Sequence, residues 1–405
     1  MIGAEVGGRK FELWVLAALA VLGSACGENI KPETLVEKMR VLSIVAEPPE
    51  VNPGESSELV ELVLNPGGKT TVVWIGCQPD PFNLGRGACN DVTSALRPTS
   101  FADFPPGTSL LGFGPKAGYT VRGDLFDVLA PDDPTRQNGT VGQILAVTLG
   151  DEIKATVTPE EFRALFARIE AREIQTLLSV TRVLTTDRVV KNTNPKLEAV
   201  LVDGERLPTN GTLLVQPGQK VELDPRVPDA AQEQYTLITP DGPSDRTEKI
   251  IGAWYSTAGR FTEPRVDLFG DVRAVYTAPG SAEVPDDPVP ERRTGKVWMV
   301  VRDGRGGQSW VEMPLFVCDS SFPTPSVTGI AAPASAGEPV SATGSNLSSA
   351  VDLVVGPIAL TNASFSSTRN AFLGDAPPLP PGTYPVSVRG KDCSVTDTGL
   401  TYTVP

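Results

Sequence analysis

The amino-acid sequence predicts an all-β protein built of β-sandwiches in tandem, with one amphipathic helix inserted in the first of them. Short apolar runs alternate along the chain with turn residues, which is typical of sandwich domains. The 39 glycines and 38 prolines form about 19% of the 405 residues, against a usual share of roughly 12%, and they supply those turns. At roughly 150 residues per domain, the length suggests two to four domains.

The composition excludes several chemistries. The chain contains no histidine, so it has no Ser-His or Cys-His nucleophile pair, no histidine base and no histidine metal ligand. Its 49 acidic side chains exceed its 35 basic ones, which gives a formal net charge of −14. That excess argues against DNA or RNA as a partner, because such binding depends on cationic side chains that displace counterions. It also argues against a basic patch that would seek anionic lipid.

The first 25 residues are predicted to be a targeting segment. Arg9 and Lys10 precede an apolar run at 13–22, which fits a signal peptide and falls short of the roughly 20 residues that span a bilayer. The run at 22–26 (LGSAC) resembles the lipobox of bacterial lipoproteins, with Gly23 where the family usually has Leu, Val or Ala. The alternative is an ordinary secretory signal with an incidental cysteine.

The lipobox resemblance implies that Cys26 carries a diacylglycerol or further acyl lipid and becomes the mature N-terminus, with residues 26–40 as lipidated cysteine and tether. Two or three acyl chains anchor a protein firmly, whereas one binds reversibly. We therefore expect an extracytoplasmic protein that is anchored to a membrane and does not cross it. Gly27 lies where some bacteria place a retention-signalling aspartate, so we expect the outer membrane, at its periplasmic face or at the cell surface.

Four cysteines remain once Cys26 carries lipid, and an even number in an exported chain favours disulfides. Three pairings are open to them. Cys77 and Cys89 flank a short loop rich in Pro and Gly, so we predict the pairs Cys77–Cys89 and Cys318–Cys393. Zinc is disfavoured by the spacing and by the lack of histidine.

The first domain is predicted at 41–190. Strands at 41–46, 59–64 and 70–74 are separated by Pro and Gly turns, and the third ends in Trp74. This order resembles the opening of an immunoglobulin-like sandwich, which implies that Trp74 is the core tryptophan of the third strand.

One helix is predicted inside the first domain. The run at 158–161 (TPEE) is a capping box with proline at the first helical position. Four apolar residues follow at the spacing of one buried helix face, and we interpret them as core packing rather than a cofactor site: Phe162, Leu165, Phe166 and Ile169. A strand at 176–184 is expected to close the domain.

The second domain is predicted at 191–319. A strand with Trp254, followed by 275–279 with its Thr-Ala-Pro turn, resembles the bacterial Ig-like repeats of surface proteins. Strands at 296–302 and 309–317 flank the run at 303–307 (DGRGG). That run lacks the Gly-Lys-Ser/Thr and the following helix of a phosphate loop, so it is predicted to be a hairpin turn.

The third domain is predicted at 323–405. It combines a Pro-led strand at 325–330, a Gly-x-x-Val strand that reaches Thr-Gly-Ser-Asn by 346, and a Pro-Gly-Thr-Tyr-x-Val-x-Val strand at 381–388. Together these resemble the IPT/TIG domain, an Ig-like fold of cell-surface receptors and bacterial surface proteins. The resemblance implies a fold and an extracytoplasmic setting, and it does not imply one ligand.

No motif identifies a catalytic or metal-binding residue, and no cofactor other than the lipid is expected. The pairs Asp132/Asp133 and Asp286/Asp287 adjoin prolines, and we interpret them as solvated turns rather than as the converging carboxylates of a glycosidase. Calcium is the one metal that Asp-rich loops between Ig-like domains favour, although the sequence has neither an EF-hand pattern nor a fixed Asp-x-Asp spacing.

These observations favour a non-catalytic lipoprotein of the cell envelope or surface, whose Ig-like modules bind an envelope protein or a polysaccharide. The alternative is an exported glycan-active enzyme in which residues 78–190 carry the site. A third hypothesis is an assembly subunit of an envelope machine. Converging carboxylates in a cleft within 41–190 would favour the enzyme, and a closed sandwich with a surface helix would favour the binding protein.

Overall fold

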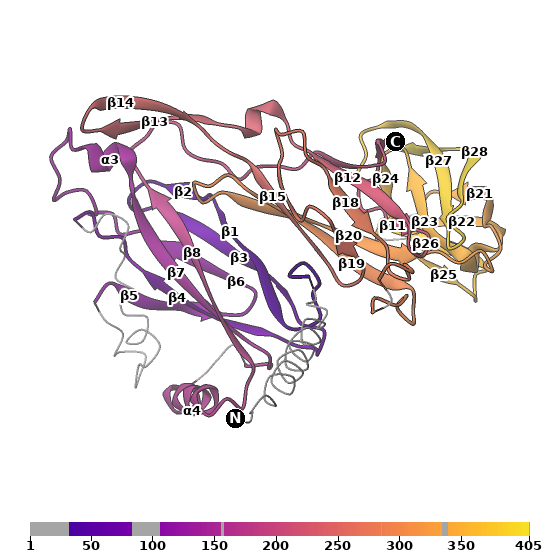
Figure 1. Cartoon of the computed structure of the whole chain (residues 1–405), viewed down its shortest axis with the longest axis horizontal. Coiled ribbons are helices and arrows are strands. Elements are labelled where there is room, and N and C mark those ends of the chain that lie inside the picture. Colours follow the sequence, from indigo (N-terminus) through magenta and orange to yellow (C-terminus); the bar gives the residue numbers. More distant parts are fainter. Residues whose placement is uncertain (1–31, 83–105, 155–157, 285, 334–338, 405) are drawn as a thin grey trace, which may run out of the picture. The chain divides into compact units, whose positions relative to one another are not determined.

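The computed structural model describes residues 32–82, 106–154, 158–284, 286–333 and 339–404, and the strand orders below refer to these residues. The fold is mostly β, as predicted, and its sheets pair into three successive Ig-like sandwiches, named here the first, second and third sandwich (Figure 1). Cys26 and Cys89 lie outside the described residues.

The first sandwich has two sheets. One has the order β1-β3-β6, formed by β1 (Arg40–Glu47), β3 (Ser56–Leu64) and β6 (Lys116–Thr120). The other has the order β2-β8-β7-β4-β5, formed by β2 (Glu50–Val51), β8 (Thr176–Thr185), β7 (Thr140–Leu149), β4 (Thr71–Cys77) and β5 (Thr108–Phe113). Trp74 is fully buried between the sheets, and its Nε1 donates to the Gly114 carbonyl at 2.8 Å. It is therefore the core tryptophan that the sequence predicts.

Two helices belong to the described part of this sandwich, α3 (Pro134–Asn138) and α4 (Pro159–Glu170). The predicted capping box of α4 is present, because Glu161 N donates to Thr158 Oγ1 and Thr158 N donates to Glu161 Oε2. Leu165 of α4 packs against Val73 and Val147, on the sheet face opposite Trp74. The stripe is thus core packing, with Phe166 and Ile169 partly buried beside it, and the Phe162 side chain lies outside the described part.

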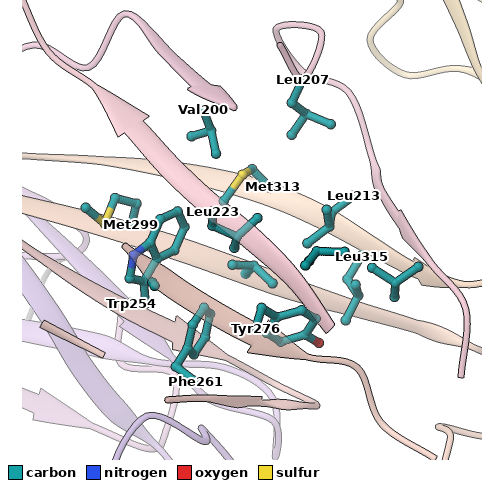
Figure 2. Packing of buried hydrophobic residues seen from close by; sticks show 14 of the residues in the cluster. Val200, Leu207, Leu213, Leu223, Trp254, Phe261, Tyr276, Met299, Met313 and Leu315 are labelled. Atoms are coloured by element: carbon teal, nitrogen blue, oxygen red, sulfur yellow. The ribbon is translucent and has the colours of Figure 1, made fainter. Parts of the chain in front are cut away.

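The second sandwich also has two sheets. One has the order β10-β9-β12-β18-β16, formed by β10 (Glu205–Arg206), β9 (Ala199–Val202), β12 (Lys220–Arg226), β18 (Ala274–Thr277) and β16 (Arg260–Phe261). The other has the order β11-β20-β19-β15-β17, formed by β11 (Leu213–Val215), β20 (Gln308–Val317), β19 (Thr294–Arg302), β15 (Ile251–Ser256) and β17 (Arg265–Asp267). Figure 2 shows side chains of both sheets meeting in one core, where Trp254 stacks on Phe261 with ring centroids 5.6 Å apart.

A separate hairpin and a short 3₁₀ turn accompany the second sandwich. The hairpin pairs β13 (Gln234–Thr239) with β14 (Gly242–Thr247), and the turn is η2 (Asp229–Ala231). The predicted strands around the run at 303–307 are β19 and β20, which pair in antiparallel register from Thr294↔Phe316 to Arg302↔Gln308. This confirms the hairpin prediction.

The third sandwich has two four-stranded sheets and the 3₁₀ turn η3 (Leu347–Ser349). One sheet has the order β21-β22-β26-β25, formed by β21 (Ser326–Ala331), β22 (Val340–Ser345), β26 (Ala371–Gly374) and β25 (Ser364–Ser366). The other has the order β24-β23-β27-β28, formed by β24 (Ile358–Ala359), β23 (Ala350–Val355), β27 (Gly382–Gly390) and β28 (Val395–Val404). A Cβ on Gly344 would lie 1.9 Å from the Ser326 carbonyl oxygen, so the close approach of β21 and β22 requires glycine there.

The last part of the predicted tether packs on the second sandwich. Val36 N donates to the Ser256 carbonyl at 2.8 Å, and Ser256 N donates to the Thr34 carbonyl at 3.0 Å. Val36 is buried in a cluster with Trp298 and Val300 of β19. Across the described residues, the helices are too short or too polar to cross a membrane.

Candidate functional site at the sandwich junctions

Two of the predicted site residues, Cys318 and Cys393, are brought together by the fold. They form a disulfide with Cα atoms 5.5 Å apart across 75 residues of sequence. Cys318 follows β20 and Cys393 lies in the turn between β27 and β28, so the bond ties the second sandwich to the third, as predicted. Cys77 is buried and disulfide-bonded at the end of β4, while its predicted partner Cys89 lies outside the described residues, as does the predicted lipidation site Cys26.

A buried ion pair lies at the same junction. Asp352 on β23 and Arg389 on β27 are cross-strand partners, and Arg389 Nη1 donates to Asp352 Oδ2 at 2.9 Å. Both Asp352 oxygens also accept from Thr212 of the second sandwich, at 2.8 Å from its amide and 2.7 Å from its hydroxyl. Arg389 Nη1 donates to the Thr212 carbonyl at 2.6 Å. Both members of the pair therefore hydrogen-bond to the same residue of the neighbouring sandwich, Thr212.

Backbone pairing extends this junction. Thr209 N donates to the Pro357 carbonyl and Ala359 N donates to the Thr209 carbonyl, each at 2.9 Å. Arg293 and Asp319 form a half-buried ion pair at 2.6 Å beside the disulfide. The second and third sandwiches are thus joined by the disulfide, by hydrogen bonds from Thr212 to the Asp352–Arg389 pair and by main-chain hydrogen bonds.

The junction of the first and second sandwiches has an apolar part and a polar part. In the apolar part, Trp298 and Val300 of β19 pack against Leu42 of β1. Arg302 Nη2 donates to the Leu42 carbonyl at 2.7 Å, and Ser43 Oγ donates to Gln308 Oε1 at 2.9 Å. These contacts hold β1 against the β19–β20 hairpin.

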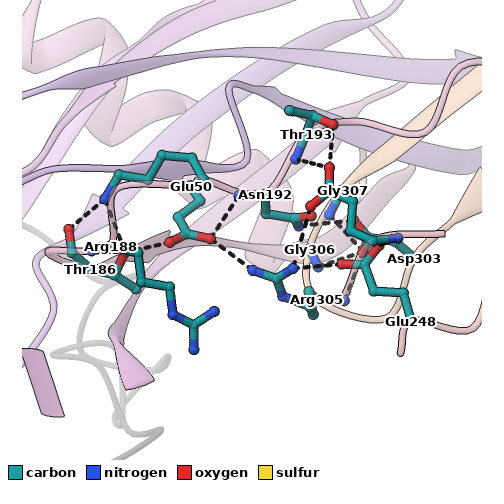
Figure 3. Close-up of polar contacts among 12 residues, drawn as sticks. Glu50, Thr186, Arg188, Asn192, Thr193, Glu248, Asp303, Arg305, Gly306 and Gly307 are labelled. Atoms are coloured by element: carbon teal, nitrogen blue, oxygen red, sulfur yellow. Dashed lines mark hydrogen bonds and ion pairs between the residues drawn. The ribbon is translucent and has the colours of Figure 1, made fainter. Parts of the chain in front are cut away.

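The polar part is centred on Arg305, at the tip of that hairpin. Its Nη2 donates to Glu50 Oε2 at 3.0 Å and its Nη1 donates to Glu248 Oε1 at 2.8 Å (Figure 3). Both carboxylate side chains are almost fully buried. The guanidinium also lies 4.4 Å from the centroid of the Tyr235 ring. Glu50 comes from β2 of the first sandwich, so Arg305 links the two modules directly.

The carboxylates of Glu50 and Asp303 accept further hydrogen bonds in this cluster. Glu50 accepts from the Thr186 hydroxyl and from Asn192 N. Asp303 Oδ1 accepts from three successive amides at 2.7–3.0 Å, which belong to Arg305, Gly306 and Gly307. Asn192 Nδ2 donates to Asp303 Oδ2 at 2.9 Å. We call Glu50, Glu248, Asp303, Arg305 and Asn192 the junction cluster.

Burial controls the electrostatics of the junction cluster. It raises the pKa of Glu248 to about 7, and the nearby Asp303 charge adds to that rise while Arg305 opposes it. Burial also raises the pKa of Asp303, against the hydrogen bonds from Asn192 and the amides. These buried carboxylates already accept hydrogen bonds from groups of the protein, and loss of one partner would leave a buried charge without compensation. The cluster is therefore better suited to hold two modules together than to act as a reactive centre.

The acidic pairs singled out in the sequence differ in outcome. Asp133 caps α3 by accepting from Thr135 N at 2.8 Å, as suits a turn. The interpretation of Asp287 as a solvated residue was wrong: it is buried, and burial raises its pKa, because its loop folds back so that Asp287 accepts from Gly259 N. Asp286 pairs with Arg260 at 2.8 Å.

The sequence did not reveal the junction cluster. Its members lie up to 255 residues apart, and the Asp-Gly-Arg-Gly-Gly run carries the composition of an ordinary turn. Within the ranges that the structure describes, no three acidic or cysteine side chains come together as a metal site would require. Calcium binding stays a prediction.

Comparison with known protein families found a match that covers the third sandwich. Residues 325–404, about a fifth of the chain, match the model of the IPT/TIG domain, which confirms the resemblance seen in the sequence. A search of curated proteins found no match to the chain.

Solved structures with tandem domains are similar over most of the chain. SGBP-B of the Bacteroides ovatus mixed-linkage glucan utilization locus, in complex with a heptasaccharide, is 12% identical, with 91% of this chain and 69% of that chain covered and a TM-score of 0.16. Three N-terminal domains of the bacteriophage RB49 outer capsid protein Hoc are 10% identical, with 89% of this chain and 95% of that chain covered and a TM-score of 0.19. The tandem Ig repeats of Dlar are 11% identical, with 69% of this chain and 97% of that chain covered and a TM-score of 0.19. Scores this low carry no argument about function.

Proposed function

We propose that this chain is a non-catalytic lipoprotein of the cell envelope, anchored to the outer membrane through a lipidated Cys26. In this proposal its three Ig-like sandwiches are exposed outside the cytoplasm and bind an envelope protein or a polysaccharide. The observation that carries the proposal is the fastening of both junctions, by the junction cluster on one side and by the Cys318–Cys393 disulfide with the Asp352–Arg389 pair on the other. Modules held this firmly suit a protein that presents surfaces at fixed positions.

The disulfide supports the extracytoplasmic part of the proposal. Disulfides persist in oxidising compartments and are rare in the cytosol, and Cys318–Cys393 joins modules rather than closing a redox motif. The IPT/TIG match at 325–404 and the lipobox-like run at 22–26 support the same location.

The use made of the buried carboxylates supports the non-catalytic part. Glu50 and Glu248 converge on one point, as the carboxylates of a glycosidase would, but Arg305 lies between them and pairs with both. A retaining or inverting glycosidase needs its two carboxyl groups free to reach a sugar. The alternative of a glycan-active enzyme therefore has no support from this cluster.

Anchoring is tested by comparing full-length protein with Cys26→Ala in the native host. The wild type should incorporate labelled palmitate and remain with outer-membrane fractions, and the variant should lose the label and become soluble. A Ser24→Ala variant is the matched control, because it changes a neighbour and keeps the cysteine. Equal labelling of wild type and Cys26→Ala would contradict lipidation.

The binding function is tested by chemical crosslinking in intact cells, followed by identification of partners that are lost in a deletion strain. A reproducible envelope partner would support the proposal. The enzyme is tested in parallel by incubating purified full-length protein with envelope polysaccharides and measuring new reducing ends. Release of reducing ends that disappears in Glu50→Gln would overturn the non-catalytic assignment.

A further inference from the structure

A cavity of about 380 Å³ lies between the second and third sandwiches. Ligand sites favour such boundaries between domains, and their volumes begin at about 300 Å³. The second sandwich contributes the strands and turn around β10 and β11, and the third contributes the outward face of β27 and the start of β28. Because the junction is fastened by the disulfide and by Asp352, the cavity is formed before any ligand arrives.

The wall from the third sandwich carries one buried cation. The Arg389 side chain is only 11% exposed and lines the cavity beside Ser387, which shares its face of β27. Among the described residues, both hydrogen bonds of the Arg389 guanidinium run through Nη1. Its Nη2 and Nε groups therefore keep their donors for another acceptor, while Asp352 fixes the orientation of the guanidinium plane.

The wall from the second sandwich combines aliphatic and charged groups. Leu207, Leu213 and Leu214 line it, together with Asp203, Glu205 and Arg206 at its exposed edge. The Asp203 carboxylate is held by the Glu222 amide, which donates to Oδ1 at 2.8 Å. The cavity therefore offers fixed donors, fixed acceptors and an apolar surface together.

The charges around the cavity select the class of ligand. Arg206 and Arg389 are balanced by Asp203 and Glu205, and Asp352 adds one further negative charge. An anionic ligand would meet this excess of acid, in a protein whose overall charge is −14. A neutral ligand with many hydroxyl groups fits better, since each hydroxyl both donates to a carboxylate and accepts from a guanidinium.

We propose that the cavity between β10, β11, β27 and β28 binds a neutral saccharide, with Arg389 and Ser387 on one side and the Asp203–Arg206 edge on the other. This inference deepens the proposed binding function and rests on it, because it names the polysaccharide rather than a protein as the ligand of this site. A peptide that added a strand is disfavoured, because the neighbouring edge strand β10 has only two residues to pair with it.

Val395 offers a way to block the cavity without disturbing the fold. It lies opposite Arg389 on the neighbouring strand, lines the cavity and is 66% exposed. Val395→Trp should fill the opening, while Val180→Trp places the same side chain at an exposed position on β8 of the first sandwich. The second variant is the matched control for surface hydrophobicity.

The test uses full-length protein in a detergent without a sugar headgroup. Saturation-transfer NMR and titration calorimetry would follow glucose, galactose, mannose, N-acetylglucosamine and their β-linked disaccharides up to about 20 mM, since single-site sugar binding of this size is expected near the millimolar range. Binding should be lost in Val395→Trp and kept in Val180→Trp. Arg389→Lys should weaken it about tenfold or more, because the planar fork of donors is lost, and unchanged melting temperatures would show that the variants fold.

Three outcomes would overturn the inference. They are no binding by any of these sugars, equal binding by Val395→Trp and Val180→Trp, and tighter binding of glucuronate or of a short peptide at the same cavity. The proposed function fails separately. If one of these three outcomes is found while wild type and Val395→Trp both crosslink to the same envelope partner in cells, the cavity assignment falls and the binding function stands.

Discussion

Glu50 and Arg305 form an ion pair at 3.0 Å across 255 residues of sequence, with the Glu50 side chain fully buried. The two residues belong to different sandwiches, and Arg305 pairs with Glu248 through its other terminal nitrogen. A buried ion pair adds little net stability compared with an apolar replacement of both partners, but removing one partner leaves a buried charge without compensation.

Replacing Arg305 with methionine should therefore destabilise the protein by about 3–5 kcal/mol. The loss should appear in urea unfolding as a lower midpoint. Lys116→Met is the control, because the Lys116–Glu58 pair is more than half exposed and such pairs contribute about 0–1 kcal/mol. Similar losses in both variants would contradict the role given to Arg305.

Glu61 should make stability depend on pH. This residue lies inside the first sandwich, where Thr148 Oγ1 donates to its carboxyl group at 2.8 Å, and burial raises its pKa to about 7. A raised pKa means that the folded state binds the proton more tightly than the unfolded state. The stabilisation is complete below the unfolded value of 4.5 and is lost as the pH rises through about 7.

The Glu61→Gln variant should remove that contribution, which is on the order of 3 kcal/mol between these limits. Unfolding free energies measured from pH 4.5 to 8 should fall less steeply than in the wild type. The remaining slope should reflect the other buried carboxyl groups whose pKa is raised, which are Glu248, Asp287 and Asp303. Glu58→Gln on the same strand is exposed and should leave the slope unchanged. A wild-type slope in Glu61→Gln would refute the assignment.

Loss of the Cys318–Cys393 disulfide should loosen the junction of the second and third sandwiches. Its loop spans 75 residues, and the removal of such a crosslink typically costs about 2–4 kcal/mol. Cys393→Ser together with Cys318→Ser should speed hydrogen exchange at the Asp319 and Thr209 amides, which donate to carbonyls of the third sandwich. Exchange within β7 of the first sandwich should stay as it was. Unchanged exchange at the Asp319 and Thr209 amides would contradict the prediction.

Asn138 should hold the β13–β14 hairpin. Its Nδ2 donates to the Ile238 carbonyl at 2.7 Å and its Oδ1 accepts from Ile238 N at 2.8 Å, so the side-chain amide acts as one rung of a β-ladder. Asn138→Asp removes the donor and brings a carboxylate towards the carbonyl, a loss of about 1–3 kcal/mol. Exchange of the amides at 234–239 should accelerate, while Asn370→Asp, at an exposed turn of the third sandwich, should have no effect there.

Much of the fold could be predicted because local patterns determine it. Proline and glycine turns delimit β1, β3 and β4, the capping box at Thr158 begins α4, and the bulky Trp74 and Trp254 require a core. The pairing of Cys318 with Cys393 is one of three open to four cysteines, and it is favoured because Cys77 and Cys89 flank a short loop rich in Pro and Gly.

The junctions could not be predicted in this way, because nothing local distinguishes a buried charge from a solvated one. Arg305 lies among glycines and Glu50 follows two prolines, which is the usual setting of exposed turns. They become buried only when two modules meet. Asp287 shows the same limit, since its loop looks solvated in the sequence and folds back onto Gly259 in the structure.

The pairing of Thr34 and Val36 with Ser256 restricts how far the protein could stand from a bilayer. Thr34 lies only eight positions after Cys26, and a fully extended chain spans at most about 3.6 Å per position. With lipid on Cys26, Ser256 of the second sandwich would thus lie within roughly 30 Å of the lipid headgroups. The lipid anchor would then be connected to the protein through its second sandwich, rather than through its first.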